Sequence, residues 1–155
     1  MKMAQKLETA KSSYDKVVCL LRIEANAILR ASERLDDQSV RQAVELISKC
    51  SGKIVVMGVG KSGVIAQKIA QTLTSTGTIA VFVHPSDALH GSLGVITGGD
   101  VVIALSNSGE TDEILALLPS LAKRETPLIA IVGNQNSTLS LKSAVSLDAS
   151  VDKEA

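Results

Sequence analysis

Aromatic residues are almost absent from this chain of 155 residues, which holds one Tyr, one Phe and no Trp. Without a set of aromatic rings it cannot offer a base-stacking platform for single-stranded nucleic acid. The chain also lacks an excess of either charge, since 16 Lys and Arg balance 16 Asp and Glu. A neutral chain has no positive field to hold phosphate backbones or anionic membrane surfaces. We therefore expect neither a nucleic-acid partner nor a membrane partner.

Long apolar runs and cysteine pairs are missing as well. No apolar stretch approaches the ~20 residues that a membrane-spanning helix needs. The first residues carry charges throughout and have no apolar core, so they do not resemble a signal peptide. Cys19 and Cys50 form no CxxC pair and are interpreted as small apolar residues in helices, which fits a reducing compartment. We expect a cytoplasmic chain that forms a single domain.

Residues 3–35 are predicted to form one long helix. Apolar side chains recur there at alternating spacings of four and three, interrupted at Glu24, and form a stripe on one face: Met3, Leu7, Ala10, Tyr14, Val17, Leu21 and Ile28. Such a stripe suits a helix that lies on its own domain and equally a helix that packs against a second subunit. The sequence then predicts a break with a cap at 36–37 and a second helix over 38–50, with an inward face formed by Val40, Val44 and Ile47.

From residue 53 onward, short β-branched runs alternate with helical patterns. The predicted strands cover 54–57, 79–83, 101–105, 128–132 and 145–147, and the predicted helices cover 64–73 and 114–123. Strands that are apolar along their whole length are covered on both faces, which favours a parallel sheet with right-handed crossovers. The expected fold class is α/β, a three-layer sandwich with a five-stranded parallel sheet flanked by helices. We expect this Rossmann-like or flavodoxin-like core over 53–155, preceded by an N-terminal helical segment over 1–52.

A glycine-rich turn, GVGKSG over 58–63, follows the first predicted strand. It matches the GxGxxG pattern of dinucleotide sites, but the second strand ends in VHP rather than in the acid that binds a ribose. A P-loop would need glycine at position 55, which is valine. The remaining interpretations are an anion site, formed by helix N–H groups with Lys61 and Ser62, and a plain tight turn.

A second polar turn, SNSGET over 106–111, follows the third predicted strand. One hydroxyl would suffice to cap the next helix, but this turn carries three, beside an amide and a glycine. Hydroxyls around free helix N–H groups suit a phosphate monoester. Glu110, Asp112 and Glu113 lie in the same first helical turn, where acids complement the helix dipole but would repel phosphate. The conflict is eased if the acids point away, which would leave one of them available for chemistry.

Both histidines of the chain, His84 and His90, lie between the second and third predicted strands. Their spacing of six does not place two metal ligands on one helical face, so a structural metal site is disfavoured. A histidine in such a loop is often no more than polar surface. Ligands of open parallel sheets bind outside the carboxyl ends of the strands, so the residues that directly follow each strand are the candidates for function.

Taken together, these segments resemble the sugar isomerase (SIS) domain family, in which GVGKSG and SNSGET are the two phosphosugar-binding loops. More narrowly, GKSGVIAQKIAQTLTSTGT, FVHPSDALHGSLG, SNSGETDEI and the terminal DKEA are similar to D-arabinose-5-phosphate isomerases, over about residues 15–155. The resemblance implies the SIS fold and interconversion of D-ribulose 5-phosphate and D-arabinose 5-phosphate through an enediol, for Kdo, lipopolysaccharide or capsule synthesis. Such a route needs a carbon base, a proton shuttle between two oxygens and donors for the enediolate charge.

The resemblance also assigns residues. It implies catalytic groups at Lys61, His90, Glu113 and Glu154, with a glutamate as the carbon base, His90 as the oxygen shuttle and Lys61 as the charge stabiliser. It implies phosphate and sugar contacts from Gly60, Ser62, Gly77, Thr78, His84, His90, Ser106, Asn107, Ser108, Gly109 and Thr111. No cofactor is expected, and the histidine that matches His84 can hold an inhibitory divalent metal such as zinc.

The sequence stops at Ala155, before the final helix and the tandem CBS domains that most family members carry. It is therefore expected to be a single, truncated SIS domain over 1–155. The resemblance implies a sugar-phosphate substrate and a homo-oligomer, usually a tetramer. The main alternative is a regulatory SIS domain that binds phosphosugars without catalysis, because it would carry the same serine-rich turns. A nucleotide-binding Rossmann domain is a second and weaker alternative. Only the enzyme would need all four catalytic groups.

Overall fold

The computed structural model describes residues 12–151, which fall into two compact units, one holding α2 and the other spanning Asp36–Ser150. Helix α2 covers Ser13–Arg34 and is capped by Ser12, whose hydroxyl accepts the N–H of Asp15 at 3.1 Å. The backbone of Ser12 is extended (φ −136°, ψ 160°), so the helix predicted over 3–35 is interrupted at residue 12, and its earlier part lies outside the described residues. The predicted stripe residues Met3, Leu7 and Ala10 lie outside the described residues.

The second predicted helix is confirmed as α3, Asp37–Ser48, which begins after the cap Asp36. Of the three residues predicted to face inward, Ile47 packs against the core and Val40 is half-buried, but Val44 is exposed, and Ala43 is the buried residue of the helix. Helix α3 packs against β5, and a small side chain at position 43 lets the two come close. The apolar spacing of Val40, Val44 and Ile47 placed Val44 on the inward face. In the folded helix Val44 lies outside the contact between α3 and β5.

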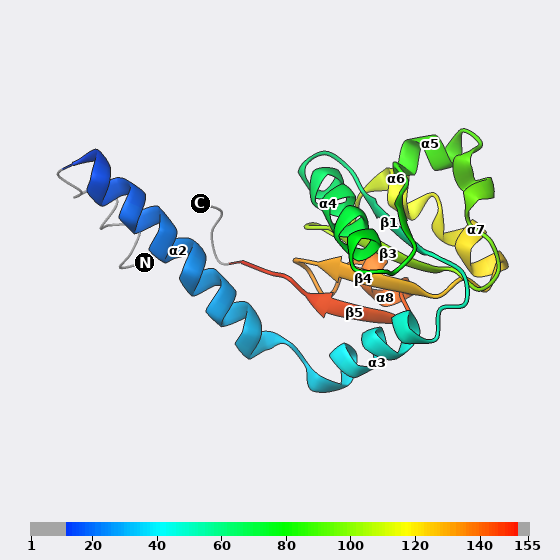
Figure 1. Cartoon of the computed structure of the whole chain (residues 1–155), viewed down its shortest axis with the longest axis horizontal. Coiled ribbons are helices and arrows are strands. Elements are labelled where there is room, and N and C mark those ends of the chain that lie inside the picture. The colour runs from blue at the N-terminus through cyan, green and yellow to red at the C-terminus, as the bar shows by residue number, and fades with distance from the viewer. Residues whose placement is uncertain (1–11, 152–155) are drawn as a thin grey trace. The chain divides into compact units, whose positions relative to one another are not determined.

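The predicted five-stranded parallel sheet is confirmed (Figure 1). Its strands pair in the order β2-β1-β3-β4-β5, and all four pairings are parallel. Strands β1 and β3 are buried at every residue, as their continuous apolar sequences predict. The strand bounds are β1 Ile54–Gly58, β2 Ala80–Phe82, β3 Val101–Ser106, β4 Leu128–Val132 and β5 Val145–Asp148.

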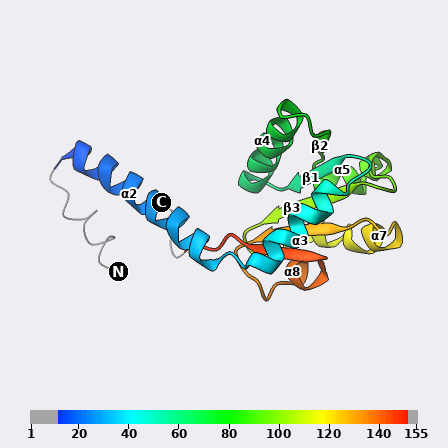
Figure 2. The ribbon, with the colours of Figure 1, turned by 60° about the horizontal axis from the view of Figure 1, so that its bottom comes forward.

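Helices cover both faces of the sheet and complete the predicted three layers. The chain moves from β1 outward to β2 and then back across the sheet toward β5. Because crossovers between parallel strands are right-handed, this reversal puts α4 on one face, together with α3, and the later helices on the other. Figure 2 shows α3 and α8 on the two sides of β5. The bounds are α4 Lys61–Ser75, α5 Pro85–Leu89, η1 Ser92–Val95, α6 Asp112–Leu115, α7 Leu118–Lys123 and α8 Thr138–Lys142.

The short helices after β2 depart from the prediction. The segment expected as one helix over 114–123 forms α6 and α7, with Pro119 in the first turn of α7. Proline has no N–H to donate to a preceding turn, so the helix must restart there. Helices α5 and α8 were not predicted, although His84 before Pro85 and Ser137 before Thr138 cap them. Across residues 12–151, no helix combines the length and the apolar character needed to span a membrane.

Candidate phosphosugar site at the switch point of the sheet

The two polar turns meet where the direction of the chain through the sheet reverses. Strands β1 and β3 are neighbours, and the chain leaves them toward opposite edges of the sheet. Gly58, the last residue of β1, pairs with Leu105, so the two turns begin side by side at the carboxyl edge. This order of strands is that of the flavodoxin-like fold, in which ligands bind at the β1/β3 switch point. The fold therefore places the two polar turns next to each other.

The glycines of the β1–α4 turn have different physical roles. A Cβ on Gly63 would lie 2.8 Å from the carbonyl oxygen of Gly58, so these two glycines let α4 pack closely on β1. Gly60 caps α4 with a left-handed φ of 58°, and its side-chain position faces open space. Lys61, which is exposed, and Ser62, which is half-buried, are the first two residues of α4. The open side of the turn therefore carries the residues that were predicted to bind phosphate.

The β3–α6 loop is shaped by three of its own hydroxyls, those of Ser106, Ser108 and Thr111. The Oγ of Ser106 lies 2.7 Å from the Oγ1 of Thr111 and accepts the N–H of Gly109 at 2.9 Å. Ser106 is buried, whereas Asn107 and Ser108 are exposed. Ser108 also contributes inside the loop, because its Oγ accepts the N–H of Glu110 at 3.2 Å. The described contacts thus give Ser106 and Ser108 a role in holding the loop, and Asn107 and Ser108 are the residues exposed at its surface. The predicted phosphate contacts of all these residues stay predictions.

The acids beside the loop are arranged differently from one another. Glu110 uses its Oε1 to accept the backbone N–H of Thr138 at 2.6 Å, so this carboxylate is engaged by the start of α8. Asp112 and Glu113 are the first two residues of α6, where the former is exposed and the latter half-buried. The repulsion expected between acids and phosphate is thus reduced at Glu110, whose carboxylate is already hydrogen-bonded. Of the two acids at the start of α6, Glu113 is the one that is partly shielded from solvent.

The histidine segment lies next to this loop because α5 packs beside α6. His84 caps α5, and its Nδ1 accepts the N–H of Ser86 at 3.3 Å, while its ring meets Phe82 edge-on with centroids 6.4 Å apart. His90 ends α5 and is exposed. Zinc takes four protein or water ligands, and no group of three or more His, Cys, Asp or Glu side chains suited to a metal occurs among residues 12–151. The metal predicted at His84 stays a prediction.

Gly77 and Thr78 lie away from the other predicted site residues of the same chain. They follow α4 and precede β2, which places them at the amino edge of the sheet. Gly77, with φ 96°, donates its N–H to Thr74, and Thr78 donates to Leu73, the two hydrogen bonds of a Schellman cap. Their described contacts end a helix, and their predicted sugar contacts are not tested within one chain. Glu154 lies outside the described residues.

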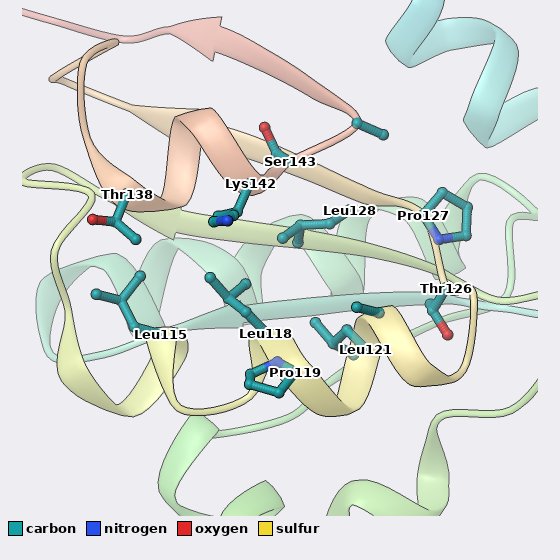
Figure 3. A pocket seen from close by; sticks show the side chains of 12 residues that line it. Leu115, Leu118, Pro119, Leu121, Thr126, Pro127, Leu128, Thr138, Lys142 and Ser143 are labelled. Carbon is teal, nitrogen blue, oxygen red and sulfur yellow. The ribbon is translucent and has the colours of Figure 1, made fainter.

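A separate apolar pocket of about 630 Å³ lies between α7 and α8 over β4. Figure 3 shows Leu115, Leu118 and Leu121 facing Leu128 across it, with Lys142 above. None of the residues predicted for the phosphosugar site lines this pocket. The candidate site is instead the open carboxyl edge formed by the turns after β1, β2 and β3.

The model of the SIS domain family matches residues 46–155, which include both polar turns. The chain belongs to the SIS domain family. This membership confirms the predicted family. The matched range starts within α3, so most of the α/β unit lies inside it.

Two curated relatives of this SIS domain are named for the same activity. The arabinose 5-phosphate isomerase KdsD of Pseudomonas aeruginosa is 44% identical over 155 residues, which are 100% of this chain and 46% of the relative. The protein of the same name from Escherichia coli K12 is 46% identical over 136 residues, 88% of this chain and 41% of the relative. The chain thus spans less than half the length of these relatives.

Solved structures show the same fold. A protein of Escherichia coli CFT073, solved in complex with arabinose 5-phosphate, has a TM-score of 0.78 and 40% identity, covering 92% of this chain and 77% of that one. A Listeria monocytogenes protein described as a sugar-phosphate isomerase has a TM-score of 0.87 and 35% identity, covering 94% of this chain and 78% of that one. The predicted SIS fold is therefore confirmed.

The segment after β4, residues 133–138, borders the β3–α6 loop and was not predicted to belong to the site. Its sequence, GNQNST, is rich in residues that favour turns and helix caps. It also follows a predicted strand, as the two recognised turns do. Its composition and its position after a strand would have placed residues 133–138 at the carboxyl edge of the sheet. Neither signal indicates which residues of the β3–α6 loop this segment contacts.

Proposed function

We propose that this chain is the catalytic domain of an arabinose 5-phosphate isomerase, which interconverts D-arabinose 5-phosphate and D-ribulose 5-phosphate. The observation that carries the proposal is the meeting of a lysine-bearing turn and a hydroxyl-rich turn at the switch point of the sheet. A phosphate monoester, which both sugars carry, suits helix N–H groups and short hydroxyl side chains. The relatives named for this activity support the choice of sugar.

In the proposed reaction, Ser62, Asn107 and Ser108 bind the phosphate and leave the reacting carbons near the first turn of α6. A five-carbon sugar phosphate spans about 6–7 Å from phosphorus to these carbons, which is close to the ~5.4 Å pitch of a helix. Glu113 then removes the proton from the carbon next to the carbonyl and returns it to the neighbouring carbon. His90 carries a proton between the two oxygens, and Lys61 stabilises the negative charge of the enediolate. Glu154 is the second candidate for the base.

The proposal includes a homo-oligomer, with a tetramer as the expected form. Gly77 and Thr78 lie at the opposite edge of the sheet from the two turns. Their expected contacts with the sugar would therefore come from a neighbouring subunit. A cytoplasmic location and a role in Kdo, lipopolysaccharide or capsule synthesis belong to the same proposal, and they rest on the resemblance in sequence.

The substitution Glu113→Gln tests the proposed chemistry. It keeps the size of the side chain but removes the base, so turnover of arabinose 5-phosphate should fall at least ~100-fold, the low end for the loss of a general base. Exchange of the proton next to the carbonyl with heavy water, followed by NMR, should fall in parallel, while thermal stability and affinity for phosphate stay close to wild type. Asp112→Asn is the matched control, because it removes an exposed carboxylate one residue earlier and should leave turnover near normal.

Two outcomes would contradict parts of this proposal. Near-normal turnover of Glu113→Gln would remove Glu113 from the catalytic groups and leave Glu154 or His90 as the base. Tight binding of arabinose 5-phosphate by the wild-type chain without any proton exchange or turnover would favour the regulatory, non-catalytic alternative.

A further inference from the structure

The β3–α6 loop is joined on one side to the segment that follows β4. The N–H of Gly133 donates to the carbonyl of Asn107 at 2.9 Å, and the N–H of Leu139 donates to the carbonyl of Gly109 at 3.1 Å. The approach is close, since a Cβ on Gly109 would collide with the Oγ of Ser137. The loop that presents the candidate phosphate-binding groups is therefore shaped by its contact with this neighbouring segment as well as by its own hydroxyls.

Glu110 supplies a third link, and this link runs through its side chain. Its Oε1 accepts the backbone N–H of Thr138, the first residue of α8, at 2.6 Å. The other two links join backbone groups. The Glu110 link is therefore the one that a substitution can remove while the rest of the contact stays in place.

We propose that Glu110 is a positioning residue for phosphosugar binding, which holds the β3–α6 loop against the start of α8 without touching the substrate. The proposal rests on the function proposed above. It accounts for an acid in a turn suited to phosphate, because the carboxylate is occupied by Thr138. The exposed Asn107 and Ser108 lie three and two positions before Glu110, so loss of the link frees the part of the loop that presents them.

The link can be broken from either side. Glu110→Ala removes the acceptor, and Glu110→Gln retains an oxygen that can accept the same hydrogen bond without the charge. Thr138→Pro removes the donor at the first position of a helix, where proline is well tolerated. The preceding Ser137, at φ −77° and ψ 160°, already has a conformation that proline allows before it. Thr138→Ala is the matched control, because it changes the side chain and keeps the N–H.

Titration calorimetry measures the binding of arabinose 5-phosphate and of inorganic phosphate. It is applied to the wild type, to the four variants and to the double variant that combines Glu110→Ala with Thr138→Pro. Glu110→Ala and Thr138→Pro should each weaken arabinose 5-phosphate binding about 10-fold, the upper end for losing one ordinary hydrogen bond. The double variant should bind no more weakly than either single variant, since both remove one interaction. Glu110→Gln and Thr138→Ala should bind like the wild type. Amide hydrogen exchange at Gly109 should speed up only in the variants that lose the link.

The outcomes separate the two proposals. If Glu110→Gln binds as weakly as Glu110→Ala, the charge of Glu110 matters rather than its hydrogen bond. If Thr138→Pro binds normally, the hydrogen bond between Glu110 and Thr138 is dispensable. Either result overturns the positioning role. A wild-type chain that binds neither ligand would refute the proposed function instead, while hydrogen exchange would still report whether Glu110 holds the loop. Thermal melting shows whether each variant is folded. If Glu110→Ala is not folded, the comparison of Thr138→Pro with its control Thr138→Ala carries the test.

Discussion

Asp100 is a buried carboxylate that joins the starts of two strands at the amino edge of the sheet. It has 1% of its surface exposed, and it precedes β3 directly as Lys53 precedes β1. Its oxygens accept the Lys53 N–H at 2.9 Å, the Lys53 ammonium at 2.7 Å and the Thr97 N–H at 2.7 Å. Burial alone raises the pKa of Asp100, but the hydrogen bonds from Lys53 and Thr97 outweigh it and lower the pKa below its ordinary value. The charged form is therefore favoured in the folded state.

We predict that Asp100→Asn lowers the free energy of unfolding at pH 7 by about 1–3 kcal/mol, because it disrupts hydrogen bonds to a charged group. A carboxyl whose pKa is lower in the folded state contributes stability above its unfolded pKa of ~3.9 and loses that contribution as the pH falls through the folded value. The difference between wild type and variant should therefore shrink below about pH 4. Urea unfolding at a series of pH values measures this, with the exposed Asp87→Asn as control. A difference that stays constant down to pH 3 would contradict the prediction.

At the scale of elements, the contact between β1 and α4 positions the β1–α4 turn. Gly58 and Gly63 allow this contact, because a Cβ on either would lie under 3 Å from the backbone of the other element. The turn between them is short, and Gly60 alone in it takes a left-handed φ. The glycine pattern that resembles a nucleotide site is thus explained largely by packing, and it leaves Lys61 and Ser62 at the open end of α4.

We predict that Gly63→Ala destabilises the fold by about 1–3 kcal/mol, the usual cost of adding a methyl group where there is no room. The new Cβ would lie 2.8 Å from the carbonyl oxygen of Gly58, so α4 must move away from β1. Chemical denaturation compares this variant with Gly94→Ala, whose added methyl meets no atom within 4 Å. Equal stability of the two variants would mean that α4 adjusts without cost and that its start is not held by β1.

At the scale of the whole molecule, α2 carries an apolar stripe that its own unit leaves exposed. Tyr14, Leu21 and Ile28 are 76%, 60% and 72% exposed, and α2 contains no buried residue within the described chain. Covering such a face releases on the order of 25 cal/mol for each Å² of apolar surface. The structure therefore leaves the two interpretations of this stripe open, and the proposed oligomer favours packing against a second subunit.

We predict that replacing Leu21 and Ile28 together by Gln reduces the oligomer to a smaller species at micromolar concentration. The physical reason is the loss of the apolar contact between subunits. Size-exclusion chromatography with light scattering measures the mass. The matched double substitution Arg22→Gln with Glu33→Gln lies outside the stripe, leaves the net charge unchanged and should keep the wild-type mass. A wild-type chain that is monomeric in this measurement would contradict both the prediction and the proposed tetramer.

Local sequence patterns were sufficient for the strands and for the two turns at the switch point. Continuous apolar runs predicted β1 and β3, and the glycine and hydroxyl clusters predicted the turns that follow them. The patterns failed where contacts outside a segment or a single residue decided the result. Pro119 divided a predicted helix into α6 and α7, and Val44 was assigned to a buried face because its spacing could not show how α3 meets β5.

The sequence by itself determined the α/β class, the family and the chemical character of the turns, because these depend on which residues are neighbours along the chain. The tertiary structure alone decided which segments far apart in the sequence make contact, such as the hydrogen bond between Glu110 and Thr138, 28 residues further along. The order of the strands and the direction of each crossover bring such residues together or keep them apart. No local pattern records that order, so the environment of each predicted site residue followed only from the fold.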